Sequence, residues 1–532
     1  MSVNRRAFLA SSATVGAAMA MPGVASAEGR PTLGPVTITP GDPRFEDLVL
    51  RGQNDRFTPR PESFRVVGST DQVVRVVGEA VRAGKRVSVR SGGHCYENFV
   101  GDPQPGVVID MVEMNDVYYD QERRAFVIQP GALLSDVYQT LYFGWDVTIP
   151  GGQCGTVAAG GHILGGGYGP LSRRDGSVVD YLYAVEVVVV ERNGQARAIV
   201  ATREPDDPHR DLWWAHAGGG GGNFGIVTKY WMRSPGATGN DPSKLLPRPP
   251  SATLGGVMIW NWPDLTKDRF RRLLTNHGQW YERNTAPDTL ASVFMINGHK
   301  KGQPPPPPLA GDLFLTAQID AGAPNAERYL RGYFEAISDG VGGTPIISPQ
   351  PTPWLTSVQR SVQGVGEIGR QKNKAAYLRR RYNDHQLDTL YAQLSNVDPS
   401  LAVTMLWLVS YGGKVNTVDP AATALADRDS LLKTVYIAAW EDPAADDAHI
   451  KWIRQFYKDV YAETGGVPVP NEVNGGSYIN YPDIDLADPA WNTSGVPWST
   501  LYYKGNYPRL QRIKAKYDPR DVFTHKLGIR PA

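Results

Sequence analysis

The sequence predicts an α+β protein with more than one domain, and three observations lead to this prediction. The chain has 532 residues, more than a single hydrophobic core usually serves, so we expect two or three domains. A strand–helix–strand pattern near the start predicts a parallel unit. Further along, two β-branched runs around an Asn-Gly pair predict antiparallel structure. Strands of both kinds, together with amphipathic helices, are typical of the α+β class.

The parallel unit covers residues 63–90. "SFRVVGSTDQVVRVVGEAVRAGKRVSVR" reads as a strand, a helix and a second strand. Ser69 and Gln72 have the spacing of a capping box at the helix start, and Gly84 suits the position just after the helix. The second strand leads directly into a glycine-rich turn. We therefore expect backbone N–H groups to be exposed where that strand ends.

The antiparallel part begins with "AVEVVVVERNGQARAIV". This stretch predicts a hairpin, in which Asn193-Gly194 forms a type I′ turn. Three later glycines have the spacing of the dinucleotide motif G-x-G-x-x-G, which has to open a helix. Here they precede "IVTKYWMR", which is β-branched. We therefore expect a strand there, with the glycines allowing close backbone contacts.

The N-terminus predicts export. Arg5-Arg6 precede a weakly apolar stretch that ends in the small residues "VASA". This pattern is typical of a twin-arginine signal peptide, cleaved after residue 27. The apolar stretch is too short to cross a bilayer. The net charge of +1, with both signs mixed along the chain, gives no indication of a nucleic-acid or membrane partner.

The two cysteines, Cys95 and Cys154, leave three interpretations open. An exported protein permits a disulfide between them. A metal site would use both cysteines with His94 and His162, but adjacent His94 and Cys95 face one ion poorly and no C-x-x-C spacing is present. The third interpretation is covalent attachment of a flavin through His94 and Cys154, with Cys95 a buried thiol. The glycines around both residues favour it, because a pyrophosphate needs a cradle of N–H groups.

Five stretches occur in the same order as in a known family. They are "SVRSGGHCYENF", "PGGQCGTVAAGGHILGGGYGPLSRRDG", "DLWWAHAGGGGGNFGIVT", "SYINYPDIDL" and "YDPRDVF". The chain resembles the berberine-bridge-enzyme-like flavin oxidases of the vanillyl-alcohol-oxidase superfamily. Within that group it is most similar to bacterial oxidases that tailor secreted natural products. The resemblance implies the two-domain FAD-binding fold of that superfamily (the PCMH type), with a substrate domain built on an antiparallel sheet.

The resemblance and a Pro/Gly-rich change of composition near residue 236 together predict the domain organisation. We expect four segments: a signal peptide over residues 1–27, the first part of the FAD domain over 45–235, a substrate domain over 236–460, and a C-terminal return to the FAD domain over 461–532. A proline tract, Pro304–Pro308, reads as a surface polyproline loop.

The resemblance also implies how FAD is held. His94 would bond to the 8α-methyl group of the flavin and Cys154 to its C6 atom. The remaining positions that match cofactor contacts are Ser91, Gly92, Gly93, Gly160, Gly161, Gly165, Gly166, Gly167 and Val227. No metal is expected.

The "YINY" stretch implies the catalytic residues. Tyr481 is expected to take the hydroxyl proton, with Tyr411 as its helper; Tyr478 and Asn480 contact the flavin ring, and Tyr168 touches the substrate. A free tyrosine has a pKa of about 10, too high for a base at neutral pH without help. Two further histidines in glycine-rich stretches, at 162 and 216, are expected to make structural hydrogen bonds.

These inferences predict an FAD-dependent alcohol oxidase. Its substrate would be a hydroxyl of a secreted natural product, such as an antibiotic or its sugar, converted to a carbonyl while dioxygen becomes hydrogen peroxide. The alternatives are a hexose or oligosaccharide oxidase, an FAD-dependent cyclase, and a disulfide-stapled carbohydrate-binding protein without catalysis. The partners are small molecules, and the protein would be a monomer or a homodimer.

Overall fold

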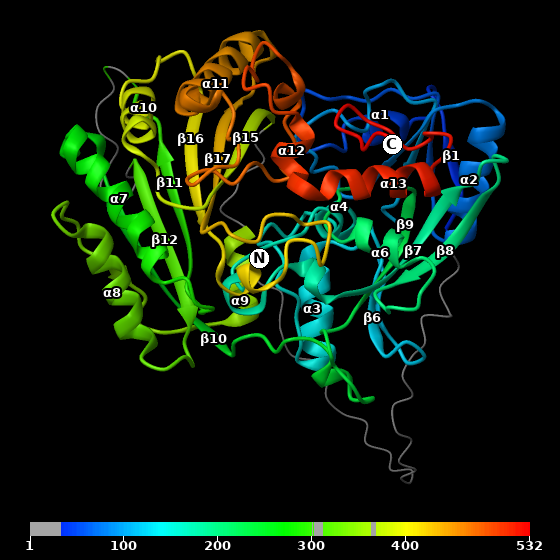
Figure 1. Ribbon diagram of the computed structural model, residues 1–532, viewed down its shortest axis with the longest axis horizontal. Coiled ribbons are helices and arrows are strands. Elements are labelled where there is room, and N and C mark those ends of the chain that lie inside the picture. The colour runs from blue at the N-terminus through cyan, green and yellow to red at the C-terminus, as the bar shows by residue number, and fades with distance from the viewer. Residues whose placement is uncertain (1–32, 301, 303–311, 363–368) are drawn as a thin grey trace, which may run out of the picture. The chain divides into compact units, whose positions relative to one another are not determined.

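Three β-sheets organise the chain (Figure 1). The computed structural model describes residues 33–300, 302, 312–362 and 369–532. The predicted signal peptide and the proline tract lie outside the described residues. Within them, no helix is long and apolar enough to cross a membrane. The mixture of parallel and antiparallel strands with helices confirms the α+β prediction.

The first sheet contains the predicted strand–helix–strand unit. Its strands follow the order β1 (Val36–Ile38), β2 (Ser63–Val66), β4 (Val107–Asp110) and β3 (Val87–Arg90). Strand β4 inserts between β2 and β3 and runs parallel to both. Helix α2 (Thr70–Arg82) begins where the Ser69 side chain accepts from the Gln72 N–H. Gly84 follows the helix with φ +64°, as predicted for that position.

The second sheet is antiparallel. Its order is β5 (Val117–Asp120), β6 (Ala125–Ile128), β9 (Ile226–Met232), β7 (Leu182–Val190) and β8 (Ala196–Thr202). Strand β9 follows the three glycines directly, so the decision against a helix-opening dinucleotide motif is confirmed.

The turn of the β7–β8 hairpin differs from the prediction. Of Asn193 and Gly194, only Gly194 has a positive φ, +86°. The Gly194 N–H donates to the Glu191 carbonyl and Glu191 N–H to Gln195, so the loop is longer than a two-residue turn. The hairpin is confirmed and the type I′ turn is wrong. A turn closed by one left-handed glycine replaces it, because the loop has an extra residue.

The third sheet is the largest and wholly antiparallel. It runs β13-β10-β12-β11-β16-β17-β15, with β14 on β10. The strand bounds are β10 Ala252–Trp260, β11 Ala291–Asn297, β12 Leu313–Asp320, β13 Ile346–Ile347, β14 Thr352–Pro353, β15 Arg370–Leu378, β16 Val403–Ser410 and β17 Leu432–Trp440. The sheet falls inside the segment predicted as the substrate domain, although the domain boundary itself stays a prediction.

Helices cover one face of this sheet (Figure 1). They are α7 (Lys267–Arg283), α8 (Ala326–Ser338), α10 (Asp384–Leu394) and α11 (Asp446–Val460). Side chains alternate between the two faces of a strand, and in β16 the pattern is regular. Leu406 and Leu408 are buried, whereas Met405 and Trp407 are only half-buried. The face without helices is therefore the more open one, and we call it the inner face.

The remaining helices pack around the first two sheets. They include α3 (Leu134–Trp145), α4 (Ala159–Leu164), α6 (Arg210–His216), α12 (Trp498–Tyr503) and α13 (Tyr507–Tyr517). Helix α13 lies against α6 (Figure 1). Its fully buried Lys514 donates to the Asn223 carbonyl and pairs with Asp518. The C-terminal residues thus contact the segment that precedes β9.

Candidate active site

The turn after β3 carries the first predicted cofactor residues. Gly93 has φ +79°, a conformation that glycine adopts at little cost. The N–H groups of Gly92, Gly93 and His94 donate no hydrogen bond to any described residue. Successive free N–H groups at a left-handed residue form a nest for an anion. The turn therefore fits the pyrophosphate of FAD.

A buried ion pair holds this turn in place. Arg51 donates to the Ser91 carbonyl at 2.8 Å and to Asp110 at 2.7 Å. Asp110 is fully buried and also pairs with Arg90, the last residue of β3. The ion pair thus fixes the backbone at Ser91 from the side of β3, while the N–H groups of Gly92, Gly93 and His94 stay available to a ligand.

The two predicted attachment residues converge on one hydroxyl. Thr156 Oγ1 lies 3.1 Å from His94 Nε2 and 3.4 Å from Cys154 Sγ. Burial lowers the pKa of His94 to about 4, so the imidazole is neutral at neutral pH. Cys154 lies five residues before α4, in a turn that packs against the His94 turn. Thr156 was not predicted, because a hydroxyl two residues after a cysteine carries no motif of its own.

Both cysteines are free thiols. The disulfide interpretation is therefore wrong, and with it the disulfide-stapled binding protein. Burial raises the pKa of the Cys95 thiol to about 12, so it stays protonated, as expected for a buried packing residue. Among the described residues there is no group of three or more His, Cys, Asp or Glu side chains that could hold a metal ion.

Most of the predicted cofactor glycines are required by contacts inside the protein. A Cβ at Gly92 would lie 2.7 Å from the Ala158 nitrogen, and one at Gly165 would overlap the Asn480 side chain. A Cβ at Gly160, Gly166 or Gly167 would likewise meet protein atoms. At Gly161 nothing lies within 4 Å, which leaves room for a ligand. The contacts of these glycines with FAD stay a prediction.

The predicted tyrosines form one cluster with a fifth, Tyr377 of β15. The hydroxyls of Tyr481 and Tyr168 lie 2.8 Å apart. The Tyr411 ring packs edge-on against Tyr168, with centroids 5.8 Å apart, and the Tyr478 ring packs against Tyr481 at 5.1 Å. The hydroxyl partner of Tyr481 is therefore Tyr168, which was predicted as a substrate contact, and not Tyr411, which was predicted as the helper.

A buried lysine lies at the centre of this cluster. Lys433 Nζ is 3.4 Å from the ring centroid of Tyr168, 3.5 Å from that of Tyr478 and 4.3 Å from that of Tyr411. Lys433 Nζ forms no ion pair or hydrogen bond with any described residue. Its signal in the sequence was the one charged residue in the largely apolar stretch "LLKTVYIAAW".

The electrostatics of the cluster oppose charge on every group. Burial raises the pKa of Tyr481, and the hydrogen bond from Tyr168 partly offsets this. Burial lowers the pKa of Lys433 well below its ordinary value, with Asp427 acting in the opposite direction. Asp427 is itself engaged with Lys504 at 2.8 Å. A negative charge on the tyrosines is therefore stabilised chiefly by a positive charge on Lys433, and the positive charge on Lys433 by the negative charge on the tyrosines.

Asn480 and Tyr478 hold each other. Asn480 Nδ2 donates to the Tyr478 hydroxyl and to the His162 carbonyl, both at 3.0 Å. These bonds attach the tyrosine segment to α4, beside the glycines of the cofactor stretch. Whether the two residues also contact the flavin stays a prediction.

The His94 turn and the tyrosine segment touch directly. The Tyr96 ring stacks on the Tyr481 ring, with centroids 5.4 Å apart and planes at 18°. Cys154 is among the groups that raise the pKa of both Tyr96 and Tyr481. The predicted attachment residues and the predicted base are thus brought together, as the resemblance implied.

Charged side chains connect the same two segments on the other face of β15. Lys372 Nζ pairs with Glu97, with Asp483 at 2.8 Å and with Asp485 at 3.5 Å. Lys374 pairs with Asp483 and with Asp485 at 2.8 Å. We call these five residues the ion cluster. Glu97 belongs to the His94 turn and Asp483 follows Tyr481 by two residues, so the cluster fixes the distance between them.

The other two histidines considered in the sequence, at 162 and 216, make structural hydrogen bonds, as predicted. His162 Nε2 accepts from the Gly152 N–H at 3.1 Å, and burial lowers its pKa to about 4. The buried His216 bonds the Leu212 carbonyl at 2.7 Å. Val227 is buried in β9 opposite Val187, and its contact with the adenine stays a prediction.

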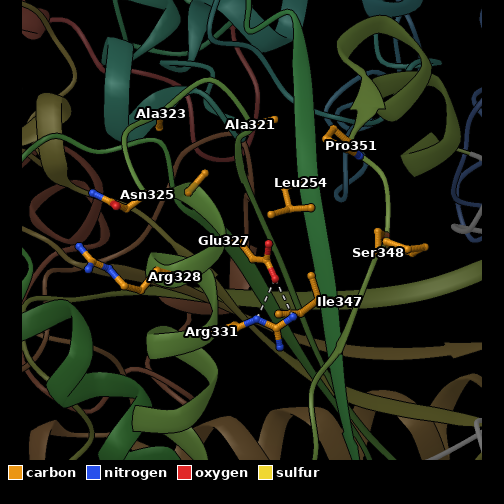
Figure 2. A pocket seen from close by; sticks show the side chains of 12 residues that line it. Leu254, Ala321, Ala323, Asn325, Glu327, Arg328, Arg331, Ile347, Ser348 and Pro351 are labelled. Atoms are coloured by element: carbon orange, nitrogen blue, oxygen red, sulfur yellow. Dashed lines mark hydrogen bonds and ion pairs between the residues drawn. The ribbon is translucent and has the colours of Figure 1, made fainter.

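A separate cavity of about 640 Å³ lies between α8, β10 and residues 347–351 (Figure 2). Glu327 and Arg331, one turn apart on α8, are among the residues that line it and pair with each other at 2.7 Å (Figure 2). None of the predicted site residues lines this cavity. It opens beside the helices that cover the outer face of the large sheet, away from the tyrosine cluster.

Comparisons with known proteins agree with this geometry. Residues 61–197 match the family model described as FAD binding domain, and residues 477–530 match the model described as berberine and berberine like. The first range contains the His94 turn and Cys154, and the second contains the tyrosine segment.

Two curated relatives cover most of the chain. Aclacinomycin-N/aclacinomycin-A oxidase of Streptomyces galilaeus is 52% identical over 498 residues, 92% of this chain and 89% of the relative. Hexose oxidase of Chondrus crispus is 30% identical over 491 residues, 83% of this chain and 85% of the relative.

Two solved structures are similar in fold over nearly the whole chain. Glycopeptide hexose oxidase complexed with teicoplanin has a TM-score of 0.88 at 54% identity, covering 94% of this chain and 100% of that structure. Aclacinomycin oxidoreductase has a TM-score of 0.89 at 51% identity, covering 93% and 100%. These likenesses confirm the predicted fold type.

Proposed function

Because this chain belongs to the berberine-bridge-enzyme-like family of FAD-dependent oxidases, we propose that it converts a hydroxyl of a natural product, or of the sugar attached to it, into a carbonyl. It is a flavin-dependent oxidase that acts on hydroxyl groups and is of the type that tailors natural products. The observation that carries the proposal is the Tyr481–Tyr168 hydroxyl pair beside the His94 turn.

FAD would be held by the free N–H groups of the His94 turn and by bonds to His94 and Cys154. The meeting of both side chains at Thr156 supports two attachment points close together. Thr156 engages Nε2 of His94, so Nδ1 is the nitrogen available for the bond. Each bond replaces one hydrogen of the flavin and one proton of the side chain, and the two electrons released pass through the flavin to dioxygen.

FAD supplies the acceptor for the hydride that leaves the carbinol carbon. The chain's own task is to remove the hydroxyl proton at the same time. Tyr481 would accept that proton in its phenolate form, and its hydrogen bond with Tyr168 supports this role. Dioxygen then receives the two electrons and two protons to give hydrogen peroxide, so atoms and electrons balance.

Lys433 supports the phenolate. Lys433 Nζ lies over the ring faces of Tyr168 and Tyr478, and Tyr168 shares the hydrogen bond of Tyr481. Burial favours the neutral amine while the tyrosines are neutral. Once the tyrosine pair carries the phenolate charge, a proton on Lys433 is favoured, because the ammonium and the phenolate attract each other. Burial alone raises the tyrosine pKa, so the base depends on this cation. The rate is therefore expected to rise with pH, as the shared phenolate forms.

The inner face of the large sheet is the proposed substrate surface. Its half-buried side chains include Met405 and Trp407 of β16, and Tyr481 packs against this part of the sheet. An aromatic and a thioether offer apolar contact to a polyketide or to the flat side of a sugar. A hexose oxidase is the second candidate, favoured by the 30% identity to such an enzyme over most of the chain.

Three measurements test the proposal. Denatured protein should keep its yellow colour, and peptide mass analysis should place flavin on His94 and Cys154. Peroxide release should follow addition of glycosylated antibiotics or hydroxylated polyketides, and free hexoses if the second candidate is right. Colourless denatured protein would exclude covalent attachment, and a panel without peroxide would exclude the oxidase assignment to these substrates.

We also propose export through the twin-arginine route, which rests on the sequence around Arg5-Arg6 alone. N-terminal sequencing of culture supernatant should find a mature chain that begins near residue 28. An intact Met1 on protein confined to the cytoplasm would contradict it.

A further inference from the structure

We propose that Thr156 is the positioning residue for flavin attachment, and that its single hydroxyl holds His94 and Cys154 together in their nucleophilic forms. The inference rests on the proposed attachment through both residues and adds the group that couples them. Thr156 lies on the exposed side of its turn, with its hydroxyl between the two side chains.

The hydroxyl can contact both residues at once because it has one proton and two lone pairs. In one direction, His94 Nε2–H donates to Thr156 Oγ1, and the Thr156 O–H donates to Cys154 Sγ. His94 Nδ1 then carries a lone pair, and no described residue is hydrogen-bonded to it. The sulfur accepts the hydrogen bond from Thr156, so its own proton is not held by the threonine and can leave when the sulfur attacks.

In the opposite direction, the thiol donates to Thr156, which donates to His94 Nε2. The proton of the neutral imidazole is then on Nδ1, and the sulfur keeps its own proton, so neither atom is a nucleophile. The two bonds are therefore coupled: the same orientation of one hydroxyl prepares or blocks both. Burial keeps the imidazole neutral, with its pKa near 4, which is the form that this argument requires.

Each bond formed on the oxidised flavin joins the nucleophile to the ring system and leaves the flavin reduced by two electrons. Dioxygen, already the acceptor in the proposed reaction, restores the oxidised state and yields hydrogen peroxide. Thr156 is neither consumed nor oxidised. Its contribution is to the rate and completeness of attachment, and it need not affect substrate turnover afterwards.

The experiment compares Thr156→Val with Thr156→Ser. Valine keeps the branched shape and removes the hydroxyl, whereas serine keeps the hydroxyl. Protein is incubated with FAD and dioxygen, samples are denatured in acid at intervals, and flavin on the peptides of His94 and Cys154 is measured by mass. Thr156→Val should form both bonds about ten- to hundred-fold more slowly, the scale of one hydrogen bond to a charged group. Thr156→Ser should attach flavin nearly as fast as the unchanged protein.

Thr493→Val is the matched control, because its exposed hydroxyl bonds only the Gly465 carbonyl. It should leave attachment unchanged. Non-covalent FAD binding and thermal midpoint, measured on all variants, separate a folding defect from slow attachment. Equal attachment rates in Thr156→Val and the unchanged protein would overturn the proposal, and so would slowing of one bond alone. Failure of the unchanged protein to carry both bonds would instead contradict the proposed bicovalent cofactor.

Discussion

Two neighbouring strands of the large sheet bury lysines in opposite ways. On the outer face, Lys372 and Lys374 of β15 meet three carboxylates within hydrogen-bonding distance. On the inner face, Lys433 of β17 meets only the faces of tyrosine rings. The carboxylates raise the pKa of Lys372 although burial opposes them, whereas burial lowers the pKa of Lys433.

The pleat of the sheet produces this separation. Tyr377 of β15 is directly opposite Lys433 of β17 in the register, so their side chains share a face. Lys372 and Lys374 are separated from Tyr377 by odd numbers of residues and therefore face the other side. There the Lys374 ammonium lies 4.8 Å from the ring centroid of Tyr457 in α11.

The difference suggests separate roles for the two kinds of buried lysine, one in the fold and one in the proposed reaction. A buried ion is tolerated when partners satisfy it, and removal of one partner is then costly. An ion without a partner costs stability in every molecule, so its retention needs another reason. We assign the ion cluster to holding two segments together and Lys433 to tuning the base.

The largest expected effect is a loss of stability when the ion cluster is broken. Lys372→Met leaves Glu97 and Asp483 without their common partner, so the free energy of unfolding should fall by about 3–5 kcal/mol. Thermal unfolding followed by circular dichroism would measure the change. The rate of flavin reduction in the molecules that remain folded should change little, because the lysine touches no reacting group.

The double variant Lys372→Met/Glu97→Gln sharpens this result. It removes one positive and one negative charge, so part of the lost stability should return. If the double variant is less stable than Lys372→Met, the cost comes from packing and not from the unpaired carboxylate.

The next largest effect is expected for the rate of flavin reduction when Tyr481, on the inner-face side of the sheet, is changed. Tyr481→Phe removes one hydroxyl and keeps the ring, so flavin reduction should slow by about 10²–10⁴-fold, the usual contribution of a general base. Thermal stability should barely change. Anaerobic stopped-flow reduction measures the rate without interference from dioxygen.

Three further phenylalanine variants distinguish the tyrosines. Tyr168→Phe should have the second largest effect, since it removes the hydroxyl that bonds Tyr481, and Tyr411→Phe should have a smaller one. If Tyr481→Phe is reduced as fast as the unchanged protein while Tyr411→Phe or Tyr478→Phe is not, the base is one of those two residues.

A smaller effect is expected from Lys433→Met. Loss of the lysine removes about 2 kcal/mol of desolvated cation–π attraction to the Tyr168 ring, which shares the hydrogen bond of the Tyr481 phenolate, or roughly a thirtyfold loss of rate at neutral pH. The rise of rate with pH should shift upward by about 1.5 pH units, because the phenolate then forms at higher pH. Stability should stay equal or increase, in contrast to Lys372→Met. An unshifted pH profile would remove Lys433 from the mechanism.

The sequence predicted the elements with strong local signals. The Ser69 cap, the strand after the three glycines and the β7–β8 hairpin were read from turn residues and β-branched runs, and all are present. The turn type was wrong because Asn-Gly also fits longer loops. The order of the strands could not be predicted from the sequence. Strand β4 inserts between β2 and β3, and this order depends on pairing between distant segments.

For the site, the motifs identified residues but not their contacts. Tyr168 and Tyr481 are 313 positions apart, and nothing local indicates that their hydroxyls bond. Lys433 could be suspected from its place in an apolar strand, but its tyrosine neighbours come from distant segments. Thr156 had no signal, because a threonine in a glycine-rich turn is common.

The smallest expected effect separates the two lysine sites by their dependence on pH. The pKa of Lys433 is lowered in the folded protein, so between that value and the unfolded value of about 10.4 the unfolded chain binds the extra proton. Stability from this site therefore rises with pH, by at most about 1.4 kcal/mol per pH unit. The pKa of Lys372 is raised, so its contribution is complete below about 10.4 and is lost only as the pH rises further. Thermal midpoints at pH 8, 9 and 10 should therefore show the unchanged protein gaining stability relative to Lys433→Met as the pH rises, whereas its difference from Lys372→Met should stay constant. The many buried tyrosines are common to all three proteins and cancel in these differences. Parallel curves for the unchanged protein and Lys433→Met would mean that Lys433 keeps its proton in the folded state, and the distinction between a paired and an unpaired lysine would then fail.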